Sequence, residues 1–323
     1  MNILVTGGAG FIGSAFVRKI FQGIPGFEDF ESLTVIDSLT YSGNLNNLAP
    51  VSLDPRLKVV VASINDPSAI QEVMNNQDYV FNFAAESHVD RSIDDASNFI
   101  ETNIKGTFQV LDQALKQSVK RVIHISTDEV YGSIPQGKFV ETSNLEPNSP
   151  YAASKASSDL IARSFFRTHN LPVITTRCSN NYGPYQHPEK LIPLAITNLL
   201  RGRRVPIYGN GLNEREWIHV DDHCRAIAHI ALLGKLGETY NIGGSNGIKN
   251  IDLIHQIISV LGLDNSMIEF VADRKGHDFR YAIDDSKLNQ LGFRESIQFE
   301  NGIIGTIKWY ESNKNWWGNL VAM

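Results

Sequence analysis

Short apolar runs alternate with amphipathic segments over the first 180 residues of the chain. The apolar runs predict strands at 2–6, 33–36, 57–62, 79–83, 121–125 and 173–177. Between them, apolar residues at helical spacing predict a helix that follows the stretch 7–13 and runs through Ile20, and helices over 67–75, 98–117 and 151–168. Strands that alternate with helices pack as a parallel sheet covered on both faces. The expected fold class is therefore α/β, with a Rossmann-like, doubly wound parallel sheet.

The pattern changes after residue 177. Turn-rich polar stretches predict loops over 178–185, 206–216 and 273–281. In the first part of the chain, the segment 23–32 is longer than its unit needs, and we expect it to be a surface insertion. Helices are expected at 189–200 and 250–261, and strands at 240–242 and 268–271. We therefore expect two domains. Residues 1–177, rejoined by the chain around 215–243, form the Rossmann-like domain, and residues 178–323 mainly form a smaller mixed α/β domain that binds the substrate.

Composition narrows the classes of partner. A net charge of -6 and a pI near 5.9 argue against nucleic acid or an anionic membrane surface. Cys178 and Cys224 are far apart and form no CxxC pair, so disulfides and structural zinc are not expected. No apolar run approaches the ~18 residues of a membrane span, and a strand-like run from residue 2 leaves no room for a signal peptide. We expect a cytoplasmic protein.

A glycine-rich turn joins the first predicted strand to the first helix. Gly8, Gly10 and Gly13 match GxGxxG, and Gly7, Gly10 and Gly13 match GxxGxxG. Either spacing lets the backbone approach a pyrophosphate and points helix N-terminal amides at it. Asp37 ends the second strand 24 residues after Gly13, where a carboxylate bonds the adenosine ribose and repels a 2′-phosphate. These residues predict a dinucleotide site that prefers NAD to NADP.

Tyr151 and Lys155 are one helical turn apart, so they share a face of the predicted helix. A phenol with a pKa near 10 needs about 4 kcal/mol to become a base near neutral pH. An ammonium ~4 Å away supplies on the order of 4 kcal/mol at an effective dielectric constant of ~20. We therefore predict Tyr151 as a base that Lys155 tunes, with an oxidised nicotinamide adding to the effect.

Asp128 and Glu129 follow Thr127 directly after the strand at 121–125. Adjacent side chains point to opposite faces of a regular strand. Both carboxylates can therefore serve one site only where the backbone bends after the strand, and Gly132 makes such a turn plausible.

His219 and His223 have the i, i+4 spacing of a metal-binding helix. A third ligand and the glutamate of HExxH are missing, and Asp221 and Asp222 suit a helix N-terminus equally well. We expect no metal.

The chain resembles the extended short-chain dehydrogenase/reductase superfamily, and within it the dTDP-glucose 4,6-dehydratase family. The resemblance covers nearly the whole chain: TGGAGFIGS at 6–14, AAESHVDRSI at 84–93, STDEVYGS at 126–133, PYAASKAS at 150–157, RCSNNYGPYQHPEKLIP at 177–193, REWIHVDDH at 215–223 and GHDFRYAID at 276–284. The glycine loop and YxxxK mark the whole superfamily. The carboxylate pair at 128–129 and the NNYGPYQ string are far more specific to the dehydratases.

The resemblance implies a hydro-lyase of deoxysugar biosynthesis that converts dTDP-glucose to dTDP-4-keto-6-deoxyglucose. Thr127 and Tyr151 contact the 4-hydroxyl, Tyr151 is the base as C4 is oxidised by NAD, and Lys155 holds the nicotinamide ribose. Glu129 then removes the C5 proton while Asp128 protonates the departing C6 hydroxyl. Return of the hydride to C6 regenerates the tightly bound NAD in each turnover.

The resemblance also implies which residues line each part of the site. Those expected to bind NAD are Gly7, Gly10, Phe11, Ile12, Gly13, Asp37, Ser38, Leu39, Thr40, Ser63, Ile64, Phe83, Ala84, Ala85, Ser87, Thr102, Tyr151, Lys155 and Asn181. Those expected to bind the nucleotide sugar are Ser87, Thr127, Asn180, Lys190, Leu191, Pro206, Ile207, Tyr208, Arg215, Asn250, His277, Arg280 and Tyr281. By their charge, Arg215 and Arg280 suit a diphosphate.

Some alternatives stay open. A 4-epimerase or decarboxylase of the same fold would share the glycine loop, Asp37, Tyr151 and Lys155 but would not require the carboxylate pair. A non-catalytic NAD sensor would lack at least one proton-handling residue, and none is missing here. The sequence does not separate a thymidine from a uridine base.

The family that the chain resembles is usually dimeric through a helix pair, for which the predicted helices at 98–117 and 151–168 are the candidates.

Overall fold

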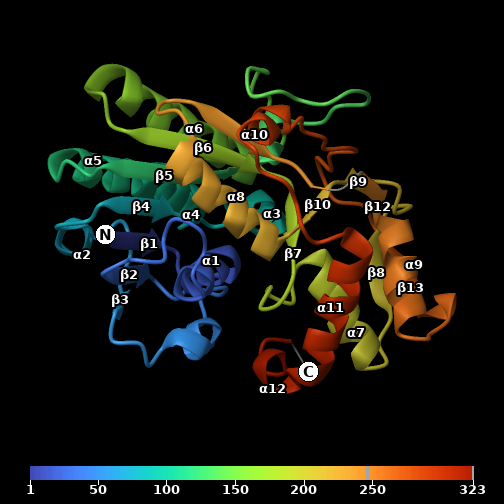
Figure 1. The fold of residues 1–323 in the computed structure, drawn as a ribbon. Helices are drawn as coiled ribbons and strands as arrows, with labels where there is room; N and C mark the ends of the chain where they lie inside the picture. Colours follow the sequence, from blue (N-terminus) through green and yellow to red (C-terminus); the bar gives the residue numbers. More distant parts are fainter. Residues whose placement is uncertain (245–246, 322–323) are drawn as a thin grey trace.

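The computed structural model describes residues 1–244 and 247–321. Within that part, seven parallel strands form one sheet in the order β11-β6-β5-β4-β1-β2-β3 (Figure 1). They are β1 (Asn2–Thr6), β2 (Ser32–Asp37), β3 (Leu57–Val61), β4 (Tyr79–Asn82), β5 (Arg121–Thr127), β6 (Val173–Cys178) and β11 (Thr239–Ile242). The order reverses direction on either side of β1, which is the doubly wound arrangement that the sequence predicts.

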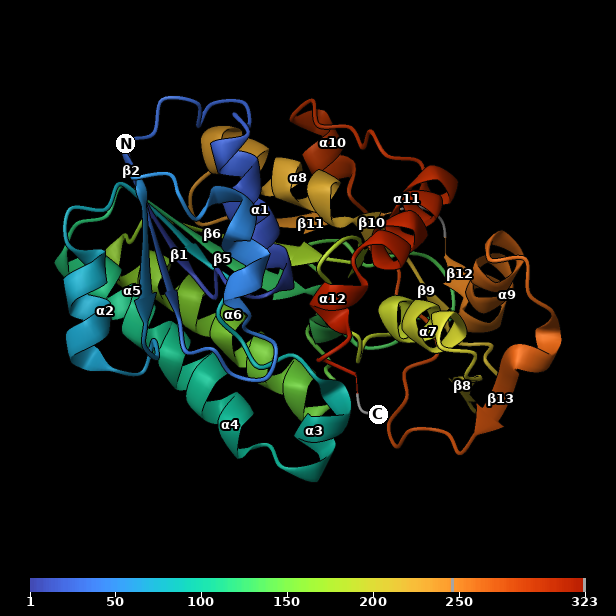
Figure 2. The same cartoon turned by 90° about the horizontal axis from the view of Figure 1, so that it is seen from below.

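Helices cover both faces of this sheet (Figure 2). α1 (Phe11–Phe21) and α8 (Val220–Leu233) pack on one face, and α2 (Pro67–Met74), α5 (Thr107–Lys116) and α6 (Pro150–His169) on the other. The helix predicted over 98–117 is composite, because α4 (Ser97–Phe99) leads through the π-helical turn η2 (Ile100–Gly106) into α5. Shorter elements complete this half: η1 (Leu45–Val51), α3 (Val89–Asp94) and η3 (Asp128–Tyr131).

The expectation of a surface insertion at 23–32 is wrong. Ile24, Phe27 and Phe30 are buried in the hydrophobic core beneath α1. Phe27 lies edge-on to Tyr79 and to Phe81, with ring centroids 5.4 and 5.8 Å apart. The segment lacks regular structure, yet its apolar residues recur every three positions and reach the core from a coil.

The C-terminal half forms a second, smaller lobe beside the sheet (Figure 1). It contains α7 (Leu191–Leu200), β8 (Val205–Tyr208), α9 (Asn250–Val260), η4 (Asn265–Met267), β13 (Ile268–Val271), α11 (Phe299–Ser312) and α12 (Lys314–Trp317) around its own core. β13 runs parallel to β8. α10 (Ser286–Gln290) instead packs beside β11 at the edge of the large sheet.

Two predicted loops contain short strands. β7 (Asn180–Tyr182), inside the stretch at 178–185, pairs in parallel with β10 (Trp217–His219). β9 (Glu214–Arg215), inside 206–216, pairs antiparallel with β12 (Ile248–Lys249). Strands of two or three residues have no periodicity for a sequence to display. These short strands contain Asn180, Asn181 and Arg215, and their pairing fixes where the three polar side chains lie.

Candidate active site

A cavity of about 570 Å³ lies at the carboxyl ends of β1, β2, β4, β5 and β6, where the second lobe faces the sheet. The carboxyl ends of parallel strands are where ligands bind in doubly wound folds. The volume is in the usual range for a cofactor or small-molecule site. Every residue to which the resemblance gives a catalytic or binding role lies in the described part of the chain, and all of these but Asp128, Leu39 and Arg280 line this cavity.

The glycine-rich turn has no room for side chains. Gly7 has φ 66°, and a Cβ at Gly7 would lie 2.7 Å from the backbone nitrogen of Ala84. A Cβ at Gly13 would lie 2.2 Å from the carbonyl oxygen of Gly7. The turn therefore places bare backbone and the first amides of α1 against the cavity, as a pyrophosphate requires.

Asp37 is buried at the end of β2, and burial raises the pKa of its carboxyl. Its oxygens accept the amide N–H groups of Ala9 at 2.9 Å and Leu39 at 2.8 Å. An ionised carboxylate has lone pairs left for ribose hydroxyls. Leu39 itself, with φ 51°, does not line the cavity.

The backbone bends immediately after β5, where the catalytic pair is predicted. Thr127 caps η3, its hydroxyl accepting the amide of Glu129 at 3.3 Å. Gly132 ends the turn at φ 83°, where an added Cβ would lie 2.3 Å from the carbonyl oxygen of Glu146. The turn replaces the regular strand in which adjacent side chains would point to opposite faces.

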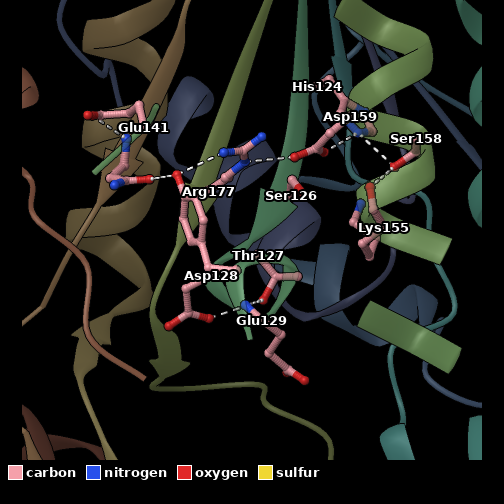
Figure 3. Close-up of polar contacts among 12 residues, drawn as sticks. His124, Ser126, Thr127, Asp128, Glu129, Glu141, Lys155, Ser158, Asp159 and Arg177 are labelled. Carbon is pink, nitrogen blue, oxygen red and sulfur yellow. Dashed lines mark hydrogen bonds and ion pairs between the residues drawn. The ribbon is translucent and has the colours of Figure 1, made fainter. Parts of the chain in front are cut away.

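The bend gives Asp128 and Glu129 different surroundings (Figure 3). Glu129 lines the cavity, whereas Asp128 lies just behind its wall, and its Oδ1 accepts the Thr127 hydroxyl at 3.2 Å. The bend therefore brings Glu129 into the cavity wall but not Asp128. Burial, Glu129 and Glu216 raise the pKa of Asp128 well above the ordinary value. Burial also raises the pKa of Glu129, but Arg215 and Lys190 oppose the rise.

Tyr151 and Lys155 lie in the cavity wall on α6. The Nζ of Lys155 donates to the carbonyl oxygen of Ile125 at 2.7 Å, and burial lowers the pKa of this lysine. Burial and the nearby Glu129 raise the pKa of the Tyr151 phenol well above its ordinary value, although a hydrogen bond with Thr127 opposes this. In the structure without a nicotinamide, burial therefore keeps the Tyr151 phenol protonated, and its role as a base stays a prediction.

The two arginines of the loop at 273–281 differ in their relation to the cavity. Arg280 points away from the cavity, its Nε donating to Glu214 at 2.9 Å and its Nη1 to the carbonyl oxygen of Gly137 at 2.9 Å. Arg274, six residues earlier, lines the cavity and pairs with Asp90 across it at 2.5 Å. Both arginines belong to the loop at 273–281, and sequence spacing alone did not say which one turns inward.

Glu189 is the centre of a second group of residues that the sequence did not single out. Its Oε2 lies 3.4 Å from Arg91, 3.6 Å from His88 and 3.9 Å from His187. The Arg91 guanidinium lies over the Tyr41 ring, 3.7 Å from its centroid. These contacts join the loops after β2 and β4 to the start of α7, so the cavity is enclosed from both lobes.

His219 and His223 have structural partners. The side chain of His219 caps α8 by accepting the amide of Asp221 at 3.2 Å. His223 lies 2.8 Å from Oδ1 of Asn181, a residue of the cavity wall. Burial lowers the pKa of His223 to about 3, so its imidazole is neutral at physiological pH. The pair therefore orders α8 and the cavity wall.

Three features together define the class of protein: the doubly wound sheet, the glycine-rich turn before α1, and the Tyr151–Lys155 pair on α6. They are those of a dinucleotide-dependent enzyme of the short-chain dehydrogenase/reductase class. The chain belongs to the NAD-dependent epimerase/dehydratase family, and the family model that matches residues 4–306 is that of GDP-mannose 4,6 dehydratase. It is 50% identical to a dTDP-glucose 4,6-dehydratase of Streptomyces niveus over 100% of this chain and 96% of the relative.

Solved structures agree with this assignment. The crystal structure of DesIV, a dTDP-glucose 4,6-dehydratase of Streptomyces venezuelae with NAD and TYD bound, has a TM-score of 0.98 and 53% identity. The match covers 99% of this chain and 100% of that one. A UDP-glucose 4-epimerase of Thermotoga maritima is more distant, with a TM-score of 0.87 and 30% identity over 97% and 99% of the chains.

No helix within 1–244 or 247–321 is both long and apolar enough to cross a membrane.

Proposed function

We propose that the protein dehydrates dTDP-glucose to dTDP-4-keto-6-deoxyglucose with bound NAD. The observation that carries the proposal is the bend after β5, which sets a buried Asp128 and a cavity-lining Glu129 beside Tyr151 and Lys155. Enzymes that oxidise and re-reduce the same carbon need only the Tyr-Lys pair. Elimination of water between C5 and C6 needs an additional acid and an additional base.

The glycine turn and Asp37 fit a dinucleotide, because bare backbone and a ribose-binding carboxylate lie at the two places such a ligand needs them. NAD is bound in the similar Streptomyces venezuelae enzyme. When bound, NAD takes the hydride from C4 of the sugar and returns it to C6, and its positive nicotinamide favours ionised Tyr151. All other steps belong to side chains of the chain itself.

Tyr151 takes the proton of the 4-hydroxyl, and Thr127 holds the same oxygen. Both hydroxyls lie in the cavity wall and interact with each other. Lys155 keeps its ammonium in place through the carbonyl of Ile125 and supports the negative charge that develops on the phenol. The 4-keto group that results acidifies the hydrogen at C5.

The unequal surroundings of the two carboxylates assign their roles. Asp128 is buried among negative neighbours, so it holds its proton and serves as the acid for the C6 hydroxyl. Arg215, Lys190 and Arg274 counter the rise that burial causes in the pKa of Glu129, because they favour its ionised form. Glu129 therefore serves as the base at C5. Because Asp128 lies behind the wall, a change of its rotamer accompanies substrate binding, as is common for side chains at binding surfaces.

Three cations face the part of the cavity formed by the second lobe, and these suit a diphosphate. Arg215 is held by the carbonyl oxygens of Glu214 at 2.7 Å and Asp278 at 2.8 Å, which fixes its guanidinium in the wall. Arg274 and Lys190 line the same region. Rigid guanidinium groups are the usual partners of phosphate oxygens. This assignment replaces Arg280 by Arg274.

The test is incubation of the purified protein with dTDP-glucose and no added reductant. The expected product is a 4-keto-6-deoxy sugar, detected by the absorbance that such compounds develop in alkali. Equal or faster turnover of UDP-glucose would overturn the choice of thymidine. Formation of dTDP-galactose in place of the keto sugar would identify a 4-epimerase and overturn the proposed dehydration.

We also propose a homodimer that forms through α5 and α6. Ile100, Phe108 and Leu160 are 53%, 42% and 57% exposed, and they lie on or just before these two helices. Apolar side chains gathered on exposed helices favour an interface.

Residues 1–177 with 215–243 would serve as the NAD-binding domain, and residues 178–323 would serve mainly as the sugar-nucleotide domain. Free Cys178 and Cys224 support a reducing, cytoplasmic location.

A further inference from the structure

Arg177 on β6 lies between the two halves of the proposed catalytic apparatus. Its side chain is 8% exposed, and its Nε donates to Oδ2 of Asp159 at 2.8 Å (Figure 3). Its Nη1 donates to the hydroxyl of Tyr131, also at 2.8 Å. A guanidinium presents several donors in a rigid plane, so one arginine can hold two partners at a fixed separation. Asp159 and Tyr131 belong to different elements, α6 and η3.

The Asp159 end of this bridge reaches the residues of the redox step. Asp159 follows Lys155 by one turn of α6, so both lie on the same helix face. Its Oδ1 lies 3.4 Å from Nε2 of His124 on β5, and that nitrogen lies 3.1 Å from the hydroxyl of Ser158. The Ser158 hydroxyl donates to the carbonyl oxygen of Lys155 at 2.7 Å. Asp159 thereby ties the Lys155 turn of α6 to β5.

The Tyr131 end reaches the residues of the elimination step. Tyr131 is the last residue of η3, the turn that begins with Asp128 and Glu129. Its hydroxyl donates to Oδ1 of Asn241 at 2.8 Å, and its ring stacks on Phe139 with centroids 5.1 Å apart. A single 3₁₀ turn has weak hydrogen bonds of its own. Its shape in this protein therefore depends on the anchor at its end.

We propose that Arg177 is a positioning residue that fixes η3, with Asp128 and Glu129, relative to α6, with Tyr151 and Lys155. The inference rests on the proposed function, because only a reaction with both a redox and an elimination step needs the two sets in register. Reacting groups misplaced by about 1 Å lose on the order of a hundredfold in rate. Neither Arg177 nor Asp159 lines the cavity.

The two ends of the bridge make separate predictions. Tyr131→Phe removes one hydroxyl and no charge, keeps the ring on Phe139, and frees η3 alone. We expect C4 oxidation to stay within about twofold while elimination slows by ten- to a hundredfold, so that reduced nicotinamide accumulates. Asp159→Asn loosens the Lys155 turn, and oxidation itself becomes slow, so reduced nicotinamide does not accumulate.

The experiment is a single turnover of the NAD-loaded enzyme with dTDP-glucose. It follows the near-ultraviolet absorbance of reduced nicotinamide and the release of keto sugar together. Tyr240→Phe is the matched control, because the hydroxyl of buried Tyr240 accepts the amide of Lys235 at 3.0 Å, and this tyrosine lies on the neighbouring strand β11. The control is expected to keep the wild-type ratio of the two signals, even where its melting temperature falls.

The outcomes separate the two proposals. If wild-type enzyme gives neither signal, the proposed function fails. If wild-type enzyme gives both signals but Tyr131→Phe keeps the wild-type ratio of oxidation to elimination, the positioning role of Arg177 is overturned. A ratio that also changes in Tyr240→Phe overturns it equally, since any lost buried hydroxyl would then have the same effect. Opposite changes in Tyr131→Phe and Asp159→Asn support it.

Discussion

At the scale of single residues, the assignment of acid and base depends on what surrounds two adjacent carboxylates. Asp128 is buried with Glu129 and Glu216 as negative neighbours, and the cation Arg215 offsets them only in part. Glu129 faces the cavity and has Arg215, Lys190 and Arg274 near it. One turn of backbone thus holds two carboxyl groups with different charged neighbours, as a paired acid and base require.

We predict that Asp128→Asn slows elimination by about 10²- to 10⁴-fold, the usual contribution of a general acid. The folded protein binds the Asp128 proton more tightly than the unfolded chain does, because the pKa is raised in the fold. This contribution to stability is complete below the ordinary carboxyl pKa and is lost as pH rises toward the folded value. Thermal melting across pH should therefore show a smaller loss of stability toward high pH in Asp128→Asn. An unchanged pH dependence would contradict the raised pKa.

Glu129→Gln has a different expected effect. The amide cannot take the C5 proton, so the keto sugar should not leave the enzyme, while C4 oxidation by Tyr151 continues. Reduced nicotinamide should accumulate on addition of dTDP-glucose and remain. The measurement is absorbance during a single turnover. Normal dehydration by Glu129→Gln would show that another group is the base.

At the scale of elements, the sequence located most strands and helices to within two residues, because buried parallel strands are continuous apolar runs. β1 and β13 agree with the predicted bounds at both ends. The failures were elements whose stability comes from tertiary contacts. β7 and β9 have two or three residues, and the segment at 23–32 has no secondary structure although Phe27 is fully buried.

Gly13→Ala tests the glycine turn as an element. A methyl group would meet the carbonyl oxygen of Gly7 at 2.2 Å, so the turn must shift, and such overpacking costs roughly 1–3 kcal/mol. We expect purified Gly13→Ala protein to carry little NAD, measured as bound nucleotide per protein. Gly305→Ala on the exposed face of α11 is the control, because nothing lies within 4 Å of the new methyl. It should keep its NAD and gain about 0.5–1 kcal/mol of stability.

At the scale of the whole molecule, the site exists because two lobes meet over the carboxyl edge of one sheet. The positions of Gly7, Asp37, Thr127 and Tyr151 at that edge followed from strand order, so the sequence could predict that they meet. The path of the loop at 273–281 did not follow from any periodicity. Which arginine of this loop lines the cavity, Arg274 or Arg280, and the loop contacts of Glu189 were therefore visible only in the structure.

The proposed dimer makes a prediction at the same scale. In a two-fold interface Leu160 occurs twice, so losing its burial at about 1.5–3 kcal/mol per copy should weaken association by a hundredfold or more. We expect Leu160→Asp to sediment as a monomer where wild-type protein sediments as a dimer. Leu53→Asp is the control, since Leu53 is 96% exposed in the turn before β3, away from α5 and α6. A monomeric wild-type protein, or a dimeric Leu160→Asp variant, would contradict this interface.

The central claim is that oxidation at C4 and reduction at C6 occur within one bound sugar through one retained cofactor. dTDP-glucose with deuterium at C4 tests it directly, by mass and magnetic resonance analysis of the product. The account predicts deuterium at C6 of the keto sugar and hydrogen from water at C5, with no added reductant. Deuterium lost to water, or left at C4 of an epimerised sugar, would contradict it.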